Sequence, residues 1–196
     1  MSKINYYKSY NELVNDLNNT NQEYFVIIDE FIYNNYSDFF KSIKNIKAFN
    51  LIVANESNKS IDMYKDTISC MLFNEISPNC TILNIGGGIV TDLGGFVAAT
   101  YKRGIKFINI PTTLIGQIDA SIGCKNGLNH DEIKNCIGTY NEPASIMICE
   151  EFLKTLPSDE LLSGKIEMFK MAISLNKDLL LELNKPLSIK TIQKFV

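Results

Sequence analysis

The stretch that decides the fold is Thr81-Ile-Leu-Asn-Ile-Gly86-Gly87-Gly88-Ile-Val-Thr91-Asp92. Residues 81–85 form a short apolar run that predicts a buried strand, and a helix is expected from about Thr91. The glycines between them let the backbone approach a phosphate, and the helix N-terminus offers unpaired N–H groups. Asp92 is expected in the first helical turn, where an acid is favoured and can hydrogen-bond a dinucleotide. The turn does not match Gly-x-Gly-x-x-Gly, so it indicates either nucleotide binding or simply a tight strand-to-helix connection.

Similar apolar runs recur along the chain and predict further strands. The predicted strands cover residues 24–28, 49–54, 81–85 and 106–110. Runs without clean alternation suit a parallel sheet covered on both faces. Helical patterns lie between them, most clearly over residues 60–75. The alternation predicts an α/β, Rossmann-like fold with a mostly parallel sheet, helices on both faces, and ligands at the carboxyl ends of the strands.

The pattern of predicted secondary structure changes after Pro143. One more strand is expected over residues 144–149, followed by continuous helix from Ser158 to about Asn184. Ser158 is the expected N-cap. The expected apolar stripe is Leu161, Leu162, Ile166, Phe169 and Ile173. We therefore expect an α/β domain over residues 1–154 and the incomplete start of an all-helical domain over residues 155–196.

Composition excludes several classes of protein. The chain is 45% hydrophobic and 21% charged, with a formal net charge of −3. Acids and bases are mixed without a basic block, which argues against nucleic acid or an anionic membrane as the partner. No apolar run approaches the roughly 20 residues that span a bilayer, and the N-terminus does not read as a signal peptide. Five widely spaced cysteines without a Cys-x-x-Cys pair indicate reduced thiols and a cytoplasmic protein.

Polar side chains gather between residues 100 and 140. Thr112 and Thr113 are expected at the carboxyl end of a strand. The polar residues that follow are Gln117, Asp119, Ser121, Lys125, Asn126, Asn129, His130, Lys134 and Asn135. This mixture suits a polyhydroxylated anion, and Arg103 can add a bidentate clamp on a phosphate or carboxylate. Taken singly, each lysine is more often a solvated charge, and Glu167 with Lys170 is by default a surface ion pair.

Taken in order, these motifs resemble the 3-dehydroquinate synthases, which are sugar-phosphate cyclases. The resemblance covers roughly residues 24–175. Its motifs are Glu56-x-x-Lys59-Ser60, Gly86-Gly87-Gly88 through Asp92 to Arg103-Gly, Pro111-Thr112-Thr113-Leu, Gln117-Ile-Asp119, Lys125-x-Gly-x-Asn129-His130, Lys134-Asn135-x-Ile-Gly138 and Phe152-Leu-x-Thr155-Leu156-Pro157.

The resemblance implies a lyase of the shikimate pathway, which leads to chorismate and the aromatic amino acids. Its substrate is the phosphorylated seven-carbon sugar acid 3-deoxy-D-arabino-heptulosonate 7-phosphate, and its product is 3-dehydroquinate. NAD transiently oxidises a secondary alcohol, phosphate is eliminated, and the reduced, ring-opened product closes to a carbocycle. A divalent metal, zinc or cobalt, polarises the reacting alcohol.

The resemblance also implies a role for individual residues. The NAD contacts would be Asp29, Glu56, Lys59, Gly86, Gly87, Gly88, Asp92, Thr112, Thr113, Asp119, Lys134 and Thr155. The substrate and catalytic contacts would be Arg103, Lys125, Asn135 and Lys170, with Asp119 between cofactor and substrate. Glu167 would be the first metal ligand.

The sequence departs from the family pattern in two ways. The family's other two metal ligands are downstream histidines, and this chain has only His130, so we expect no activity from it alone. A homodimer or a complementing C-terminal polypeptide are the expected partners. The smaller departures are Cys124 in place of glycine, Asn126 in place of threonine, Thr91 in place of glycine, and Lys165 where small residues are usual. A non-catalytic NAD-binding subunit or relic, or a sister enzyme such as 2-deoxy-scyllo-inosose synthase or valiolone synthase, stays open.

Overall fold

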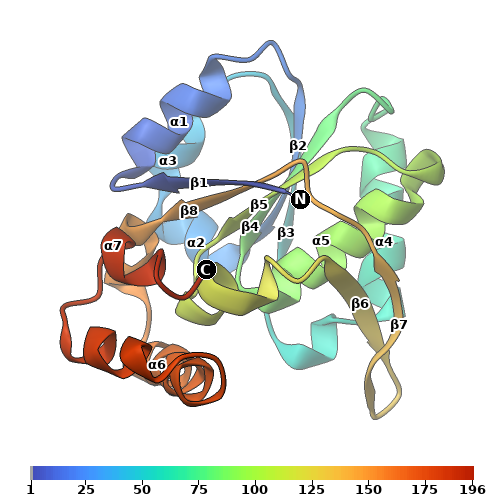
Figure 1. Ribbon diagram of the computed structural model, residues 1–196. Helices are drawn as coiled ribbons and strands as arrows, with labels where there is room; N and C mark the ends of the chain where they lie inside the picture. Colours follow the sequence, from blue (N-terminus) through green and yellow to red (C-terminus); the bar gives the residue numbers. More distant parts are fainter. Residues whose placement is uncertain (1) are drawn as a thin grey trace.

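A computed structural model describes residues 2–196, and a six-stranded sheet forms its centre (Figure 1). The strands are β1 (Lys3–Tyr7), β2 (Tyr24–Asp29), β3 (Ile46–Ile52), β4 (Thr81–Gly86), β5 (Phe107–Pro111) and β8 (Ser145–Cys149). They run in the spatial order β1-β8-β5-β4-β2-β3, and every neighbouring pair is parallel. The predicted parallel sheet is confirmed. The edge strand β1 was not predicted, because its half-exposed sequence Lys-Ile-Asn-Tyr-Tyr lacks a continuous apolar run.

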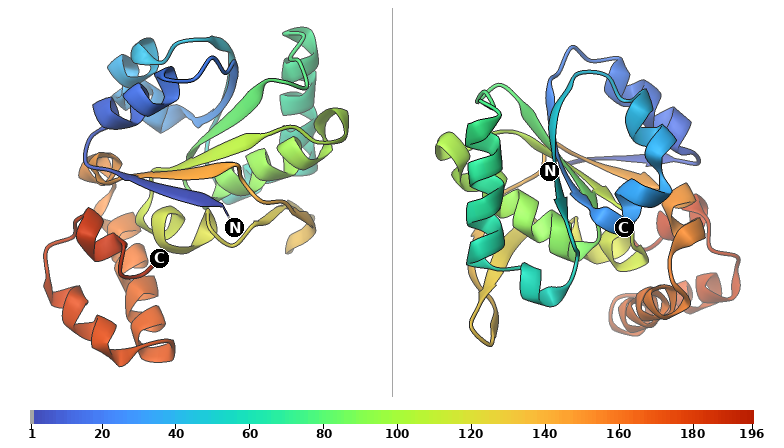
Figure 2. Two further views of the ribbon diagram at one scale, coloured as in Figure 1. Left: turned by 45° about the horizontal axis from the view of Figure 1, so that its top comes forward. Right: turned by 180° about the vertical axis from the view of Figure 1, so that it is seen from behind.

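Helices cover both faces of this sheet, as predicted (Figure 2). One face carries α1 (Tyr10–Asn18), α2 (Glu30–Asn35) and α3 (Ser37–Ser42), and the other carries α4 (Ile61–Phe73) and α5 (Gly88–Thr100). Strand β2 is apolar because both of its faces are buried. Val26 and Ile28 pack into the core on the first face, whereas Phe25 and Ile27 pack into the core on the second.

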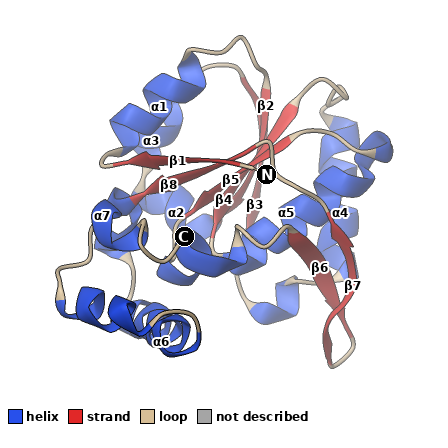
Figure 3. Cartoon of the chain, viewed as in Figure 1, coloured by secondary structure: helices blue, strands red, loops and turns tan. Residues whose placement is uncertain are grey.

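A separate antiparallel hairpin packs against α5 (Figure 3). It consists of β6 (Lys125–His130) and β7 (Ile133–Tyr140). The sequence predicts this region only as a polar stretch, because most residues of β7 are exposed and give no apolar strand signal. Close approach of the hairpin depends on Gly95 of α5, where a Cβ would lie 1.7 Å from the Asn126 side-chain oxygen.

The chain after residue 155 packs below the sheet, against β8 and the segment that follows β5 (Figure 1). It contains α6 (Ser158–Ser174), a 3₁₀ helix η5 (Lys177–Asn184) and α7 (Ile189–Ile192). The predicted continuous helix to Asn184 is wrong, because α6 ends at Ser174 and the Asn176 side chain caps η5. The predicted N-cap is also wrong. Pro157 occupies the cap position, and Ser158 is the first helical residue.

Four of the five residues of the predicted apolar stripe of α6 lie on its outward face, whereas the fifth, Leu161, packs against the core. Leu162, Ile166, Phe169 and Ile173 are 57%, 59%, 51% and 52% exposed. The buried face instead carries Gly164, Met168 and Ala172. Small residues let a helix approach its neighbour closely, and a Cβ on Gly164 would lie 2.5 Å from the Leu114 Cβ. The pattern of large apolar residues therefore predicts the wrong buried face for most of α6. Within residues 2–196, no helix combines the length and apolarity needed to cross a bilayer.

Candidate active site

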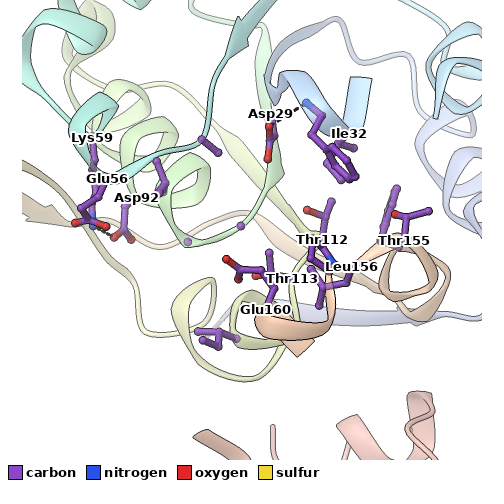
Figure 4. A pocket seen from close by; sticks show the side chains of 18 residues that line it. Asp29, Ile32, Glu56, Lys59, Asp92, Thr112, Thr113, Thr155, Leu156 and Glu160 are labelled. Atoms are coloured by element: carbon purple, nitrogen blue, oxygen red, sulfur yellow. Dashed lines mark hydrogen bonds and ion pairs between the residues drawn. The ribbon is translucent and has the colours of Figure 1, made fainter. Parts of the chain in front are cut away.

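The strand order places a crevice at the carboxyl ends of β2 and β4. The chain passes from β2 outward to β3, and then returns to β4 and β5 on the other side. Such a reversal leaves a ligand-binding crevice in doubly wound folds. Asp29 ends β2 and Gly86 ends β4, and a cavity of about 470 Å³ opens beside them (Figure 4). The predicted NAD contacts that line it are Asp29, Glu56, Lys59, Gly87, Gly88, Asp92, Thr112, Thr113 and Thr155.

The glycine turn forms one wall of this first cavity. Gly87 has the N-cap position of α5, and the helix begins at Gly88 instead of near Thr91. Asp92 therefore lies beyond the first turn, and the predicted stabilisation of its charge by the helix N-terminus is wrong. The backbone at the turn is closely packed, because a Cβ on Gly87 would meet the Thr113 methyl group at 2.9 Å. Gly87, Gly88 and Ile89, at the N-terminus of α5, line the cavity, and the free amides of a helix N-terminus suit an anionic group.

Asp92 is held by a buried lysine instead. The Lys59 ammonium contacts the Asp92 carboxylate and donates to the Asn135 side-chain oxygen at 2.5 Å. The side chains of Lys59 and Asp92 are 6% and 21% exposed. Burial raises the pKa of Asp92, and the hydrogen bond and charge of Lys59 oppose that rise.

The other polar groups around the first cavity are also held in place. Asp29 caps α2 by accepting from the Phe31 N–H at 3.0 Å, and burial raises the pKa of Asp29. Glu56 accepts from the Asn129 side chain at 2.8 Å, and this bond is the main cause of its lowered pKa. Carboxyl groups with shifted pKa values in one cavity are typical of functional sites.

A second cavity of about 530 Å³ lies on the other side of Asp92. It brings together three of the predicted substrate contacts, Asp119, Lys125 and Asn135. Asp119 comes from a π-helix (Gly116–Ala120), and the other two come from the hairpin. Because Asp92 lines both cavities, the two sites share a wall.

Other predicted site residues lie outside these two cavities. Arg103 lines a third cavity with Lys106 and Tyr140. Lys134 pairs with Glu56 at 3.6 Å, and Gly86 precedes the turn. Each of these residues stays a predicted contact.

Lys170 and Glu167 form an ion pair of 2.9 Å on α6. The hydrogen bond and charge of Glu167 raise the pKa of Lys170, and the charge of Asp119 adds to the shift. Neither Lys170 nor Glu167 lines the first or the second cavity, and both stay predicted contacts.

The donor set does not fit a complete metal site. In the described part of the chain, residues 2–196, no three His, Cys, Asp or Glu side chains are grouped to hold a metal ion. A catalytic zinc site takes three protein ligands, and Glu167 alone is one. We therefore assign no step to a metal held by these residues.

The apolar wall of the first cavity was not predicted from the sequence. This wall is formed by Phe31, Ile32, Ile89, Ile115, Phe152 and Leu156. Several of these apolar residues follow the carboxyl end of a strand or the glycine turn, as the polar contacts do. Their position in the chain could therefore have predicted them. Cys136 beside Asn135 in the second cavity gave no comparable signal.

Cys124, which precedes Lys125, adopts a left-handed backbone conformation with φ of 55°. This conformation costs a residue with a Cβ about 1–2 kcal/mol, and glycine adopts it freely at a smaller entropic cost. We expect Cys124→Gly to be more stable than Cys124→Ala by about 1 kcal/mol in urea unfolding. Cys124→Ala is the matched control, because it removes the thiol and keeps the Cβ. Equal stability of the two variants would contradict strain at this position.

The fold and the two cavities define a doubly wound α/β protein with a crevice at the carboxyl ends of its strands. A family model described as "3-dehydroquinate synthase N-terminal" matches residues 50–163. A 3-dehydroquinate synthase of Clostridium tetani is 40% identical over 164 residues, covering 82% of this chain and 44% of that protein. One of Alkaliphilus oremlandii is 42% identical over 137 residues, covering 70% and 38%. The chain belongs to the 3-dehydroquinate synthase family, and it spans less than half the length of these curated relatives.

A solved structure supports the same fold. It is the 2-epi-5-epi-valiolone synthase ValA of Streptomyces hygroscopicus subsp. jinggangensis 5008, with NAD+ and Zn2+ bound. The TM-score is 0.88 at 27% identity, covering 100% of this chain and 59% of that one.

Proposed function

We propose that this chain carries the NAD-binding half of a 3-dehydroquinate synthase that acts on 3-deoxy-D-arabino-heptulosonate 7-phosphate. The observation that carries the proposal is the wall shared by two cavities. The first cavity has a glycine turn at a helix N-terminus, and the second has Lys125 and Asn135. A cofactor and a sugar phosphate bound on the two sides of Asp92 would lie next to each other.

The residues of the chain have distinct tasks in this proposal. Bound NAD supplies the hydride acceptor for oxidation of the substrate alcohol. The amides at Gly87 and Gly88 hold the pyrophosphate, while Asp29 and Asp92 accept hydrogen bonds from polar groups of the dinucleotide. Lys125 and Asn135 bind the phosphate or carboxylate of the substrate. The apolar wall around Ile32 and Leu156 keeps water from the cofactor.

We further propose that residues 155–196 begin a helical domain whose remainder covers α6. The outward face of α6 carries Leu162, Ile166, Phe169 and Ile173, which are all more than half exposed. A contiguous exposed apolar patch marks an interaction surface. The relatives contain more than twice the matched length, so further polypeptide is available to cover this face and to add metal ligands to Glu167. The 196 residues alone are therefore expected to be inactive.

Two measurements on the purified chain test this proposal. A calorimetric titration with NAD is expected to show binding, and an assay of phosphate release from the sugar acid with NAD and zinc or cobalt is expected to show none. Adding the C-terminal part of the Clostridium tetani relative is expected to restore release. No binding of NAD would refute the proposal. Turnover by the chain alone would refute the need for a complementing polypeptide.

Gly87→Ala is expected to weaken NAD binding by about tenfold, because the new methyl group displaces Thr113 and shifts the turn. Gly123→Ala is the matched control, since a Cβ there meets nothing within 4 Å. The dissociation constants from the same titration compare the two variants. Equal constants would show that the turn does not hold the cofactor.

A sister sugar-phosphate cyclase is the second candidate. The likeness to the valiolone synthase, at a TM-score of 0.88 over the whole chain, favours it specifically. Phosphate release from a panel of sugar phosphates, measured in the complemented protein, separates it from a 3-dehydroquinate synthase, which is expected to prefer 3-deoxy-D-arabino-heptulosonate 7-phosphate. A non-catalytic NAD-binding subunit would show NAD binding without turnover even after complementation.

A further inference from the structure

Asn129 lies where the hairpin meets the segment that lines the first cavity. The register of β6 against β7 shifts between Leu128 and His130, so Asn129 lies at an irregularity of the strand. Its N–H donates to the Lys59 carbonyl at 2.7 Å, and it forms an isolated parallel bridge with Ser60. The hairpin is thereby attached to the segment around Lys59 through its backbone.

The side chain of Asn129 adds contacts in two directions. Its amide nitrogen donates to the Glu56 carboxylate at 2.8 Å and to the Glu56 carbonyl at 3.2 Å. Its oxygen accepts from the Asn135 N–H at 2.9 Å. Glu56 lines the first cavity and Asn135 lines the second. One amide side chain therefore connects the walls of both cavities.

The connection continues from Asn135 back to the shared wall. Asn135 has φ of 54°, a conformation that needs local support in a residue with a Cβ. The bond to Asn129 provides that support, and the Asn135 oxygen accepts from Lys59, which also contacts Asp92. Figure 4 shows Glu56, Lys59 and Asp92 close together at one end of the first cavity.

We infer that Asn129 is a positioning residue that couples the two cavities, so that a dinucleotide in the first cavity orders the hairpin wall of the second. The inference rests on the proposed binding of NAD. NAD that contacts Glu56, Lys59 and Asp92 fixes the groups to which Asn129 and Asn135 are bonded. Because the coupling is reciprocal, an anion in the second cavity tightens NAD binding by the same factor.

Hydrogen exchange of residues 125–140 in the full chain, with and without saturating NAD, tests this inference. In the wild-type chain, NAD is expected to slow exchange of the Asn129 and Asn135 amides by about tenfold. In Asn129→Ala the response is expected to fall below about twofold while NAD still binds. Circular dichroism checks that the variant is folded.

A second variant tests the bond to Glu56 without removing the acceptor for Asn135. Asn129→Asp is expected to lose the response, because it places a carboxylate against Glu56. Combining it with Glu56→Gln exchanges donor and acceptor and is expected to restore the response at saturating NAD. His130→Ala is the matched control, since that side chain is exposed and its Nε2 lies 3.7 Å from the carboxylate of the neighbouring Asp131.

The outcomes are distinct. NAD binding with unchanged exchange in the wild-type chain overturns this inference and leaves the proposed function intact. A response that survives in Asn129→Ala or Asn129→Asp also overturns it. Absence of NAD binding to the wild-type chain overturns the proposed function and this inference together.

Discussion

Lys59→Met is expected to lower the free energy of unfolding by about 3 kcal/mol, at the lower end of the range for breaking a buried ion pair. The substitution keeps the length of the side chain but leaves the Asp92 carboxylate without its cation, and Asn135 without a donor. Asp92 is 21% exposed, so water compensates part of the loss. The same variant is expected to weaken NAD binding, because Lys59 and Asp92 line the first cavity. Urea unfolding measures the first effect.

Lys47→Met provides the matched control. Lys47 also pairs with a carboxylate, Glu23, at 2.7 Å, but the two side chains are 51% and 48% exposed. Exposed pairs contribute about 0–1 kcal/mol, so this variant is expected to lose at most about 1 kcal/mol. Equal losses in the two variants would show that burial of the Lys59–Asp92 pair has no special effect.

The loss in Lys59→Met is also expected to depend on pH. Burial raises the pKa of Asp92 even beside Lys59, and removing Lys59 raises it further. A carboxyl group with a raised folded-state pKa binds protons more tightly when folded. Its stabilising contribution is therefore present at low pH and is lost as pH rises through the folded-state pKa. The difference between variant and wild type is expected to be larger at pH 8 than at pH 4, and a difference independent of pH would contradict this origin.

Gly164→Ala is expected to lower the free energy of unfolding by about 2–3 kcal/mol, the upper part of the usual range for overpacking. A Cβ there would lie 2.5 Å from the Leu114 Cβ, and both atoms are fixed to their backbones. Alanine raises helix propensity by about 1 kcal/mol over glycine, so the loss is expected despite a favourable local term. The separation of α6 from the core would expose Met168 and Ala172, which is measurable as increased binding of a hydrophobic dye.

Ser163→Ala is the control for this variant. Ser163 is exposed on the same helix, and its hydroxyl bonds only back to the Asp159 carbonyl. A gain of a few tenths of a kcal/mol is expected from propensity alone. If Gly164→Ala were as stable as Ser163→Ala, the close contact of α6 with Leu114 would be wrong.

The sequence by itself determined the buried strands of the sheet and the glycine turn. The strands at β2, β4, β5 and β8 are buried on both faces, so their apolar runs were continuous and were predicted within a few residues. The glycine turn was also predicted from local sequence, because a backbone that approaches a ligand closely requires glycine. The ordered motifs around it identified the family, and most of the predicted NAD contacts line one cavity.

Only the tertiary structure decided what depends on partners distant in the chain. The ion pair of Lys59 with Asp92 joins residues 33 positions apart, and no local pattern distinguishes it from a surface pair. The hairpin was not predicted, because its exposed strand β7 has no apolar run. It nevertheless carries Lys125 and Asn135 to the second cavity. The orientation of α6 was decided by the close approach that Gly164 allows. Local patterns record which residues are apolar, whereas packing decides which of them a neighbour reaches.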